Sequence, residues 1–247
     1  MAIIIRPINS QTTKPIRMKY NTVLVHGRLI KRYKRFLADI ELDNGEIITA
    51  HCTNSGSMKS CIEEGAEVYL SETDNPKRKT CFTWEMIRIN NSWVGINTLI
   101  PNKLSVKAIQ NNEIEKLKGY AIVKPEVKFL DSRFDIYIEN EVEKGFVEVK
   151  NVSLKDGEYA RFPDSVSARG KKHLETLIKV KENGYRAVML YIIQRTDVSI
   201  FAPADDIDPE YGKALRKAYK AGVEIISYQV KVNPERVELL KEIPFKL

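Results

Sequence analysis

The sequence predicts a two-domain protein of the α+β or α/β class, in which a small β-barrel precedes a mixed sheet flanked by helices. Short strands separated by turn residues fill the first third of the chain, which shows almost no helical periodicity, whereas strands and amphipathic helices alternate in the second half. A length of 247 residues accommodates two modest domains. We expect the first domain over residues 1–86, with residues 1–17 as an N-terminal extension, and the second over residues 87–247.

Five short strands are expected in the first domain, separated by turns that contain glycine, asparagine or aspartate. Five such strands in about 70 residues are typical of an OB-fold barrel. A short helix is expected between two of them, at residues 57–61. The expected strands are residues 21–30, 36–42, 47–52, 67–71 and 80–89.

Helices and strands are expected to alternate in the second domain. Pro125 has no N–H to donate, so its strand belongs at a sheet edge. Residues 187–193 are almost uniformly apolar, which is typical of a buried central strand. Asp208-Pro209 is a helix-opening pair, and Gly184 and Gly222 are expected helix ends. In chain order we expect helix 112–117, strands 122–129, 134–139 and 146–152, helix 166–182, strand 187–193, a helix opened by Asp208-Pro209 and strand 223–230.

The composition favours a soluble protein with an anionic partner. The net charge is +7 and the pI is about 9.1. No apolar run is long enough to span a membrane. The three cysteines are odd in number and contain no CxxC pair, so we interpret them as reduced thiols of a cytoplasmic protein.

Two neighbouring strands carry the residues that suggest catalysis. Glu148 and Lys150 are two apart on one strand, and Asp135 lies on the strand before it. If these strands pair, two carboxylates and one ammonium group meet, and carboxylates bind Mg²⁺ or, alternatively, Mn²⁺. The spacing resembles the PD-(D/E)xK nuclease site, with Asp135 and Glu148 as metal ligands and Lys150 assisting the attacking water. The simpler interpretation is a solvated cross-strand ion pair.

Two further charges bear on this hypothesis. Glu126 is a third candidate metal ligand, or an exposed strand charge. Arg133 could pair with Asp135 and so weaken the metal site, if both lie in one extended strand.

Basic and aromatic residues indicate where nucleic acid would bind. A basic-aromatic run at residues 28–36 lies near the usual binding face of an OB-fold; the alternative is a solvated hairpin of a basic protein. Arg169 is a candidate phosphate contact at the start of a helix, whereas His173 is expected to be a core or edge histidine. The candidate DNA contacts are Arg28, Lys31, Arg32, Tyr33, Lys34, Arg35, Phe36, Lys77, Arg78, Lys79 and Arg169.

Several motifs together resemble the sugar fermentation stimulation protein family, SfsA. The stretches NSGSM (54–58), EVKNV (148–152), FPDSVSARGKKHL (162–174) and DPEYGKALRKAYKAGVE (208–224) carry the resemblance, which runs from about residue 18 to the C-terminus. Leu130 is a departure, because the family commonly has glycine there. The resemblance implies an N-terminal OB-fold, a nuclease-like second domain and DNA binding.

Three functional classes follow from these patterns. The first is a Mg²⁺-dependent nuclease acting on single- or double-stranded DNA, which the intact Asp135, Glu148 and Lys150 set favours. The second is a non-catalytic DNA-binding regulator with a vestigial site. The third is an enzyme of sugar metabolism, which would need a phosphate-binding glycine loop or a dinucleotide fingerprint, and the sequence contains neither.

Overall fold

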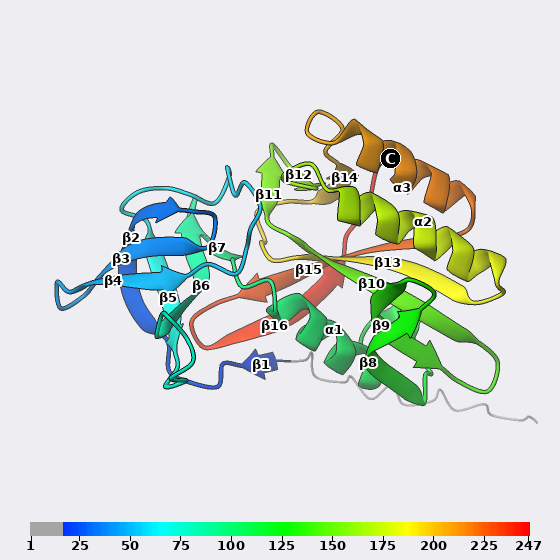
Figure 1. Ribbon diagram of the computed structural model, residues 1–247, viewed down its shortest axis with the longest axis horizontal. Coiled ribbons are helices and arrows are strands. Elements are labelled where there is room, and N and C mark those ends of the chain that lie inside the picture. The colour runs from blue at the N-terminus through cyan, green and yellow to red at the C-terminus, as the bar shows by residue number, and fades with distance from the viewer. Residues whose placement is uncertain (1–16) are drawn as a thin grey trace, which may run out of the picture.

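The computed structural model describes residues 17–247, so the expected N-terminal extension lies largely outside the described residues. Two lobes lie side by side, with the barrel at the left of Figure 1. The barrel strands follow the order β4-β3-β2-β5-β6-β7, and a further pairing of β4 with β6 closes five of them into a barrel. The OB-fold prediction is confirmed. Its strands are β2 (Val25–Tyr33), β3 (Leu37–Leu42), β4 (Ile47–His51), β5 (Glu67–Glu72), β6 (Phe82–Ile89) and β7 (Ser92–Gly95).

The barrel sheet continues beyond residue 86, where we expected the division. Asn90 and Asn91 both have positive φ angles, of 49° and 58°, as a two-residue type I′ hairpin turn requires. They fold β7 back against β6, so the sheet ends at Gly95.

The expected helix at residues 57–61 is replaced by turns. Met58 has a φ of 54°, outside the helical region, and its backbone N–H donates to Asp164 at 3.2 Å. Contact with the other domain therefore determines the conformation of this segment.

A seven-stranded mixed sheet forms the second domain, in the order β1-β16-β15-β13-β10-β9-β8. The apolar strand at its centre and the edge position of the strand with Pro125 are as predicted. β1 precedes the barrel in the chain but pairs with β16, so the first described residues belong to this sheet. Its strands are β1 (Arg17–Lys19), β8 (Ile122–Phe129), β9 (Ser132–Glu139), β10 (Lys144–Val152), β13 (Arg186–Ile193), β15 (Glu224–Val232) and β16 (Arg236–Glu242).

Helices cover both faces of this sheet (Figure 1). Helix α1 (Ile100–Gln110) packs Leu104 and Ala108 into one apolar core, and helices α2 (Ala168–Glu182) and α3 (Pro209–Lys220) pack into another. Asp208 caps α3 by accepting the Tyr211 N–H at 3.0 Å, as its sequence predicts. Within residues 17–247 no helix is long and apolar enough to cross a membrane.

Short elements complete the domain. The sequence did not predict α1, which has no side-chain N-cap, and the expected helix 112–117 is only the 3₁₀ turn η1 (Glu115–Leu117). A small sheet beside the barrel consists of β11 (Leu154–Asp156), β12 (Tyr159–Phe162) and β14 (Ile200–Pro203).

Candidate active site

The pairing of β9 with β10 brings Asp135 to the strand that carries Glu148. The two strands are antiparallel, and their ladder ends where Ile136 lies opposite Val147. Beyond that pair, Asp135 Oδ2 accepts the backbone N–H of Val149 at 2.8 Å. Its other oxygen accepts a hydrogen bond from Asn102 Nδ2 at 2.7 Å. A strand and a helix thus hold the Asp135 carboxylate in one orientation.

Glu148 is buried among cationic and polar neighbours. It is 2% exposed, and its Oε1 accepts from Lys150 Nζ at 2.6 Å. The same oxygen contacts His173 Nδ1, which helix α2 supplies. Glu148 Oε2 is buried and has no hydrogen-bond partner among the described residues. One oxygen of this carboxylate is therefore satisfied, and the other is available to a ligand.

The two carboxyl groups have different proton affinities. Burial, and then the neighbouring Glu148, raise the pKa of Asp135 from 3.8 to about 6. Burial also raises the pKa of Glu148, but His173 and Lys150 outweigh it and hold that pKa below its usual value. Such a separation between neighbouring carboxyls is common in sites that use acids and bases in distinct roles.

A divalent cation fits the vacant side of Glu148. An unpartnered buried carboxylate oxygen is costly, and a hard cation would satisfy it. Within residues 17–247 there is no cluster of three or more histidine, cysteine or acidic side chains suited to a metal. Asp135 and Glu148 therefore fit an ion such as Mg²⁺, which keeps several of its waters, better than one that needs a complete protein cage.

Glu126 lies opposite Asp135 in the β8–β9 hairpin. Pro125 pairs with Ile136 and Val127 with Phe134, so Glu126 and Asp135 lie between these two pairs, one on each strand, and Glu126 has a φ of 57°. Its side chain is 59% exposed, and its nearest cation is Arg133, at 3.9 Å. Arg133 thus forms its ion pair with Glu126.

Part of the basic-aromatic run is engaged within the barrel. Arg32 donates to the carbonyls of Arg35, Asn54 and Gly56 at 2.6, 2.8 and 2.9 Å. Lys31 and Tyr33 both contact Asp39, at 3.7 and 2.9 Å. These side chains hold the barrel and its loop together.

The other candidate DNA contacts remain on the surface. Arg28 is exposed but donates to Gly65 O at 3.0 Å. Arg78 donates to Thr83 at 2.8 Å, and Arg169 is exposed and donates to His173 at 3.3 Å. The candidates that are exposed and whose side chains form neither an ion pair nor a hydrogen bond with any residue of 17–247 are Lys34, Arg35, Lys77 and Lys79, and Phe36 is 50% exposed.

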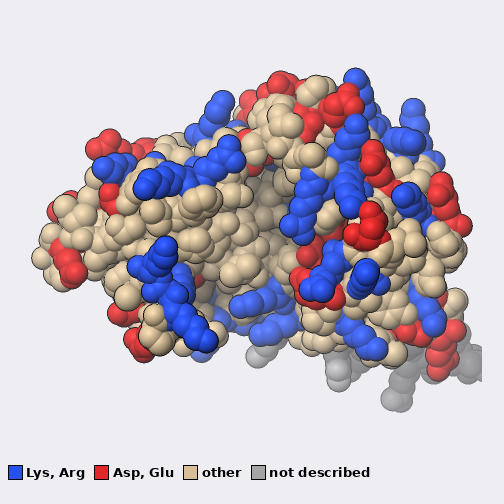
Figure 2. All heavy atoms as spheres, in the orientation of Figure 1, with Lys and Arg blue, Asp and Glu red and all other residues tan. Residues whose placement is uncertain are grey.

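A cleft of about 1020 Å³ separates the barrel from α1 and reaches Asp135. Figure 2 shows the hollow between the lobes, with lysine and arginine side chains along its rims. Thr53, Arg78 and Thr83 line it from the barrel, and Asn102 and Lys103 from α1.

Sequence reasoning did not assign two residues of this site. His173 is buried, as expected, but contacts Glu148 and lies 3.5 Å from Lys150. His173 lies four residues after Arg169, and residues i and i+4 share a helix face. The sequence therefore already indicated that His173 lies beside the candidate phosphate contact Arg169. Asn102 gave no signal, since its helix was not predicted.

The chain is similar to characterised families and structures along nearly its whole length. A family model described as "SfsA N-terminal OB domain" matches residues 30–96, and one described as "Sugar fermentation stimulation protein RE domain" matches residues 99–236. Sugar fermentation stimulation protein homologs of Geotalea daltonii and Geobacter sulfurreducens are 47% and 48% identical over 222 residues, which is 90% of this chain and 96% and 95% of theirs.

A solved structure agrees with these matches. It is titled "The structure of Pyrococcus Furiosus SfsA in complex with Ca2+", is 28% identical, and superposes with a TM-score of 0.86 over 93% of this chain and 98% of that one. Both domains are matched in order, and the chain belongs to the sugar fermentation stimulation protein family.

Proposed function

We propose that this protein is a cytoplasmic DNA-binding phosphodiesterase that uses Mg²⁺, or Mn²⁺ in its place, at Asp135 and Glu148. The unpartnered Oε2 of Glu148, buried beside Asp135 and Lys150, is the observation that carries the proposal. The relative of Pyrococcus furiosus is described in complex with Ca²⁺, another hard cation with oxygen ligands.

Each residue has a distinct role in this reaction. When bound, the metal supplies a Lewis acid and an acidified water. Asp135 is oriented for ligation by Asn102 and Val149. Lys150, 14% exposed, keeps its ammonium group against Glu148, where it stabilises negative charge that develops on the phosphodiester.

A non-catalytic DNA-binding regulator is the second candidate. Glu148 Oε1 already contacts both Lys150 and His173, so this half of the site is satisfied without any ligand. A vestigial site would retain such a network for stability alone.

Cleavage assays separate the two candidates. Wild type and Lys150→Ala would be compared on single-stranded, duplex and branched DNA with Mg²⁺ or Mn²⁺. We expect wild type to cleave at least one form and Lys150→Ala to lose about 10²–10³-fold in rate. DNA affinity should stay within a few-fold, because at most one phosphate contact is removed.

Lys144→Ala is the matched control. Lys144 lies on the same strand, but it is exposed and pairs with Glu139, so its removal should leave the rate unchanged. An inactive wild type with every metal and DNA form would leave the regulator as the function. Equal cleavage by Lys150→Ala would exclude the role given to this lysine.

A further inference from the structure

We propose that DNA reaches this site as a single strand, which enters the cleft between the barrel and α1 and lays its phosphates against Lys103 and Lys107. The inference rests on the proposed function and specifies its substrate. It moves the principal contacts away from the β2–β3 face of the barrel, where Arg32 and Tyr33 are engaged in hydrogen bonds within the barrel and the exposed Lys31 pairs with Asp39.

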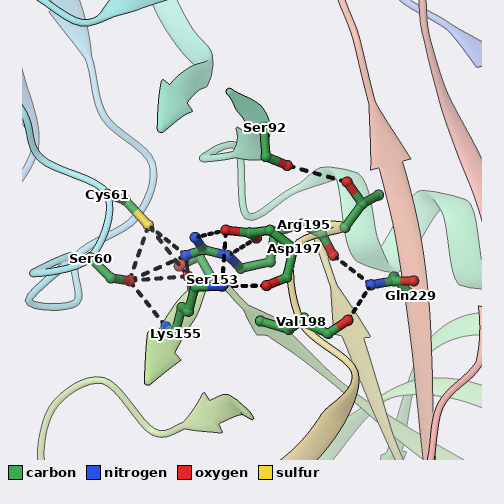
Figure 3. Close-up of polar contacts among 10 residues, drawn as sticks. Ser60, Cys61, Ser92, Ser153, Lys155, Arg195, Asp197, Val198 and Gln229 are labelled. Atoms are coloured by element: carbon green, nitrogen blue, oxygen red, sulfur yellow. Dashed lines mark hydrogen bonds and ion pairs between the residues drawn. The ribbon is translucent and has the colours of Figure 1, made fainter. Parts of the chain in front are cut away.

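Buried contacts between the domains fix the width of the cleft. Arg195, at the end of β13, is fully buried and binds Asp197 with two hydrogen bonds, at 2.7 and 2.9 Å. Its Nη1 donates to the carbonyl of Ser153 at 2.7 Å and to Ser60 Oγ of the barrel loop at 3.3 Å. Figure 3 shows this cluster joining the barrel loop to the larger sheet. Opening the cleft would break the hydrogen bond that joins this buried guanidinium to Ser60 of the barrel.

Close backbone packing adds to this restraint. The backbone N–H of Gly95 donates to the Gln194 carbonyl at 2.8 Å, and a Cβ at Gly95 would lie 2.4 Å from the Gln194 side chain. Gly56 is as tightly packed, because a Cβ there would lie 2.2 Å from the Asp164 carboxylate. The domains thus meet at two points where no side chain fits between them.

The size of the cleft favours one strand over two. The two grooves of a DNA duplex are each about 8 Å deep, so the duplex is at least about 16 Å in diameter. A cylinder of that diameter and of the 3.4 Å rise per base pair has a volume of roughly 700 Å³. The cleft, at about 1020 Å³, holds little more than one base pair. It has room for about three nucleotides of a single strand, at half that volume each. Because Asp135 lines the cleft, the reacting phosphate has to enter it.

Unpaired cations on α1 suit the backbone of such a strand. Lys103 and Lys107 lie one turn apart, line the cleft, and form no ion pair with another residue of 17–247. Arg78 lines the opposite wall. Besides Asp135, three carboxylates line the cleft. Glu72 and Glu126 are exposed to solvent, whereas Glu85 is buried, accepts hydrogen bonds from Asn97 and Ser71, and has a pKa raised by burial.

Binding without metal tests the inference separately from catalysis. Fluorescence anisotropy in EDTA would compare a labelled single strand with its duplex. We expect wild type to bind the single strand at least about tenfold more tightly. The double variant Lys103→Ala/Lys107→Ala should weaken that binding and lower its log–log salt slope by about 1.4, because each phosphate that is no longer neutralised accounts for about 0.7.

Lys217→Ala/Lys220→Ala is the matched control, because these two lysines are also exposed on one helix, α3, away from the cleft. This pair should leave single-strand affinity unchanged. The inference is overturned if duplex binds wild type as tightly as single strand does, or if the two double variants lose affinity equally.

The outcomes also distinguish this inference from the proposed function. Single-strand binding that depends on Lys103 and Lys107, without cleavage under any metal, would support the single-strand cleft and contradict the proposed phosphodiesterase activity. Metal-dependent cleavage confined to duplex DNA would support the phosphodiesterase activity and contradict binding of a single strand in the cleft.

Discussion

The charge of Asp135 has an energetic cost. Two hydrogen bonds orient it, yet burial and Glu148 raise its pKa to about 6. The folded protein thus holds this proton more tightly than the unfolded chain, whose value is near 3.8. The resulting stability is fully present below pH 3.8 and is lost as the pH rises through 6. A residue kept at such a cost is typical of a functional site.

Asp135→Asn should therefore stabilise the protein in EDTA at pH 7.5. A shift from 3.8 to about 6 corresponds to at most ~3 kcal/mol, and with partial solvent access we expect a gain of about 2 kcal/mol. The Asn102 amide can turn to present its oxygen to the new side chain. Near pH 4 the gain should disappear. Chemical denaturation at both pH values measures it.

Asp131→Asn serves as the control. Asp131 is exposed, and Lys172 lowers its pKa, so this change should give no gain at pH 7.5. A gain of equal size at pH 4 and pH 7.5 would show that the Asp135 charge is not the cause.

At the scale of single elements, the β8–β9 hairpin has a strained residue in its turn. Leu130, in its turn, has a φ of 52°, in the left-handed region that favours glycine. Leu130 is 56% exposed, so it contributes little burial in return.

Leu130→Gly should stabilise the protein. Relief of left-handed strain gains roughly 1–2 kcal/mol, and the extra entropy of glycine in the unfolded chain offsets about half of it. The expected net gain is ~0.5–1 kcal/mol, measured by denaturant unfolding.

Val142→Gly tests the explanation. Val142 lies in the turn between β9 and β10, is 92% exposed and is not among the residues with positive φ. It has no strain to relieve, so this change should lose ~0.5–1 kcal/mol. Equal losses in both variants would contradict the strain at Leu130.

Across the whole molecule, the contacts of Arg195 should make the two domains unfold together. Its guanidinium contacts a barrel loop and a loop of the second domain at once. Arg195→Met keeps much of the side-chain volume but removes the positive charge that pairs with Asp197. Lys155 also pairs with Asp197 and still neutralises part of its negative charge in the variant. We expect a loss of ~2–3 kcal/mol and separation of barrel unfolding from that of the second domain, observed by hydrogen exchange.

Arg216→Leu is the comparison for this variant. Arg216 also pairs with an aspartate, Asp205, but the pair lies at the surface of α3, where ion pairs contribute under about 1 kcal/mol. If Arg195→Met unfolds in one cooperative transition and loses as little unfolding free energy as Arg216→Leu, Arg195 does not join the domains.

Local pattern was sufficient for much of this fold. Turn residues and β-rich segments predicted the barrel, the apolar run of β13 predicted its central place, and Pro125 predicted the edge strand. The same information placed Asp135, Glu148 and Lys150 on neighbouring strands, because the period of a strand and a short connection constrain where side chains meet.

Contacts distant in sequence decided the rest. The pairing of β1 with β16, the turns of residues 57–61 and the placement of Asn102 and His173 around the carboxylates all depend on segments far along the chain. Charge in the sequence also could not reveal which cations face the cleft, since Arg32 is occupied by barrel carbonyls and Lys103 is not. A sequence determines local conformation and residue type, whereas only tertiary packing decides which polar groups satisfy one another and which remain for a ligand.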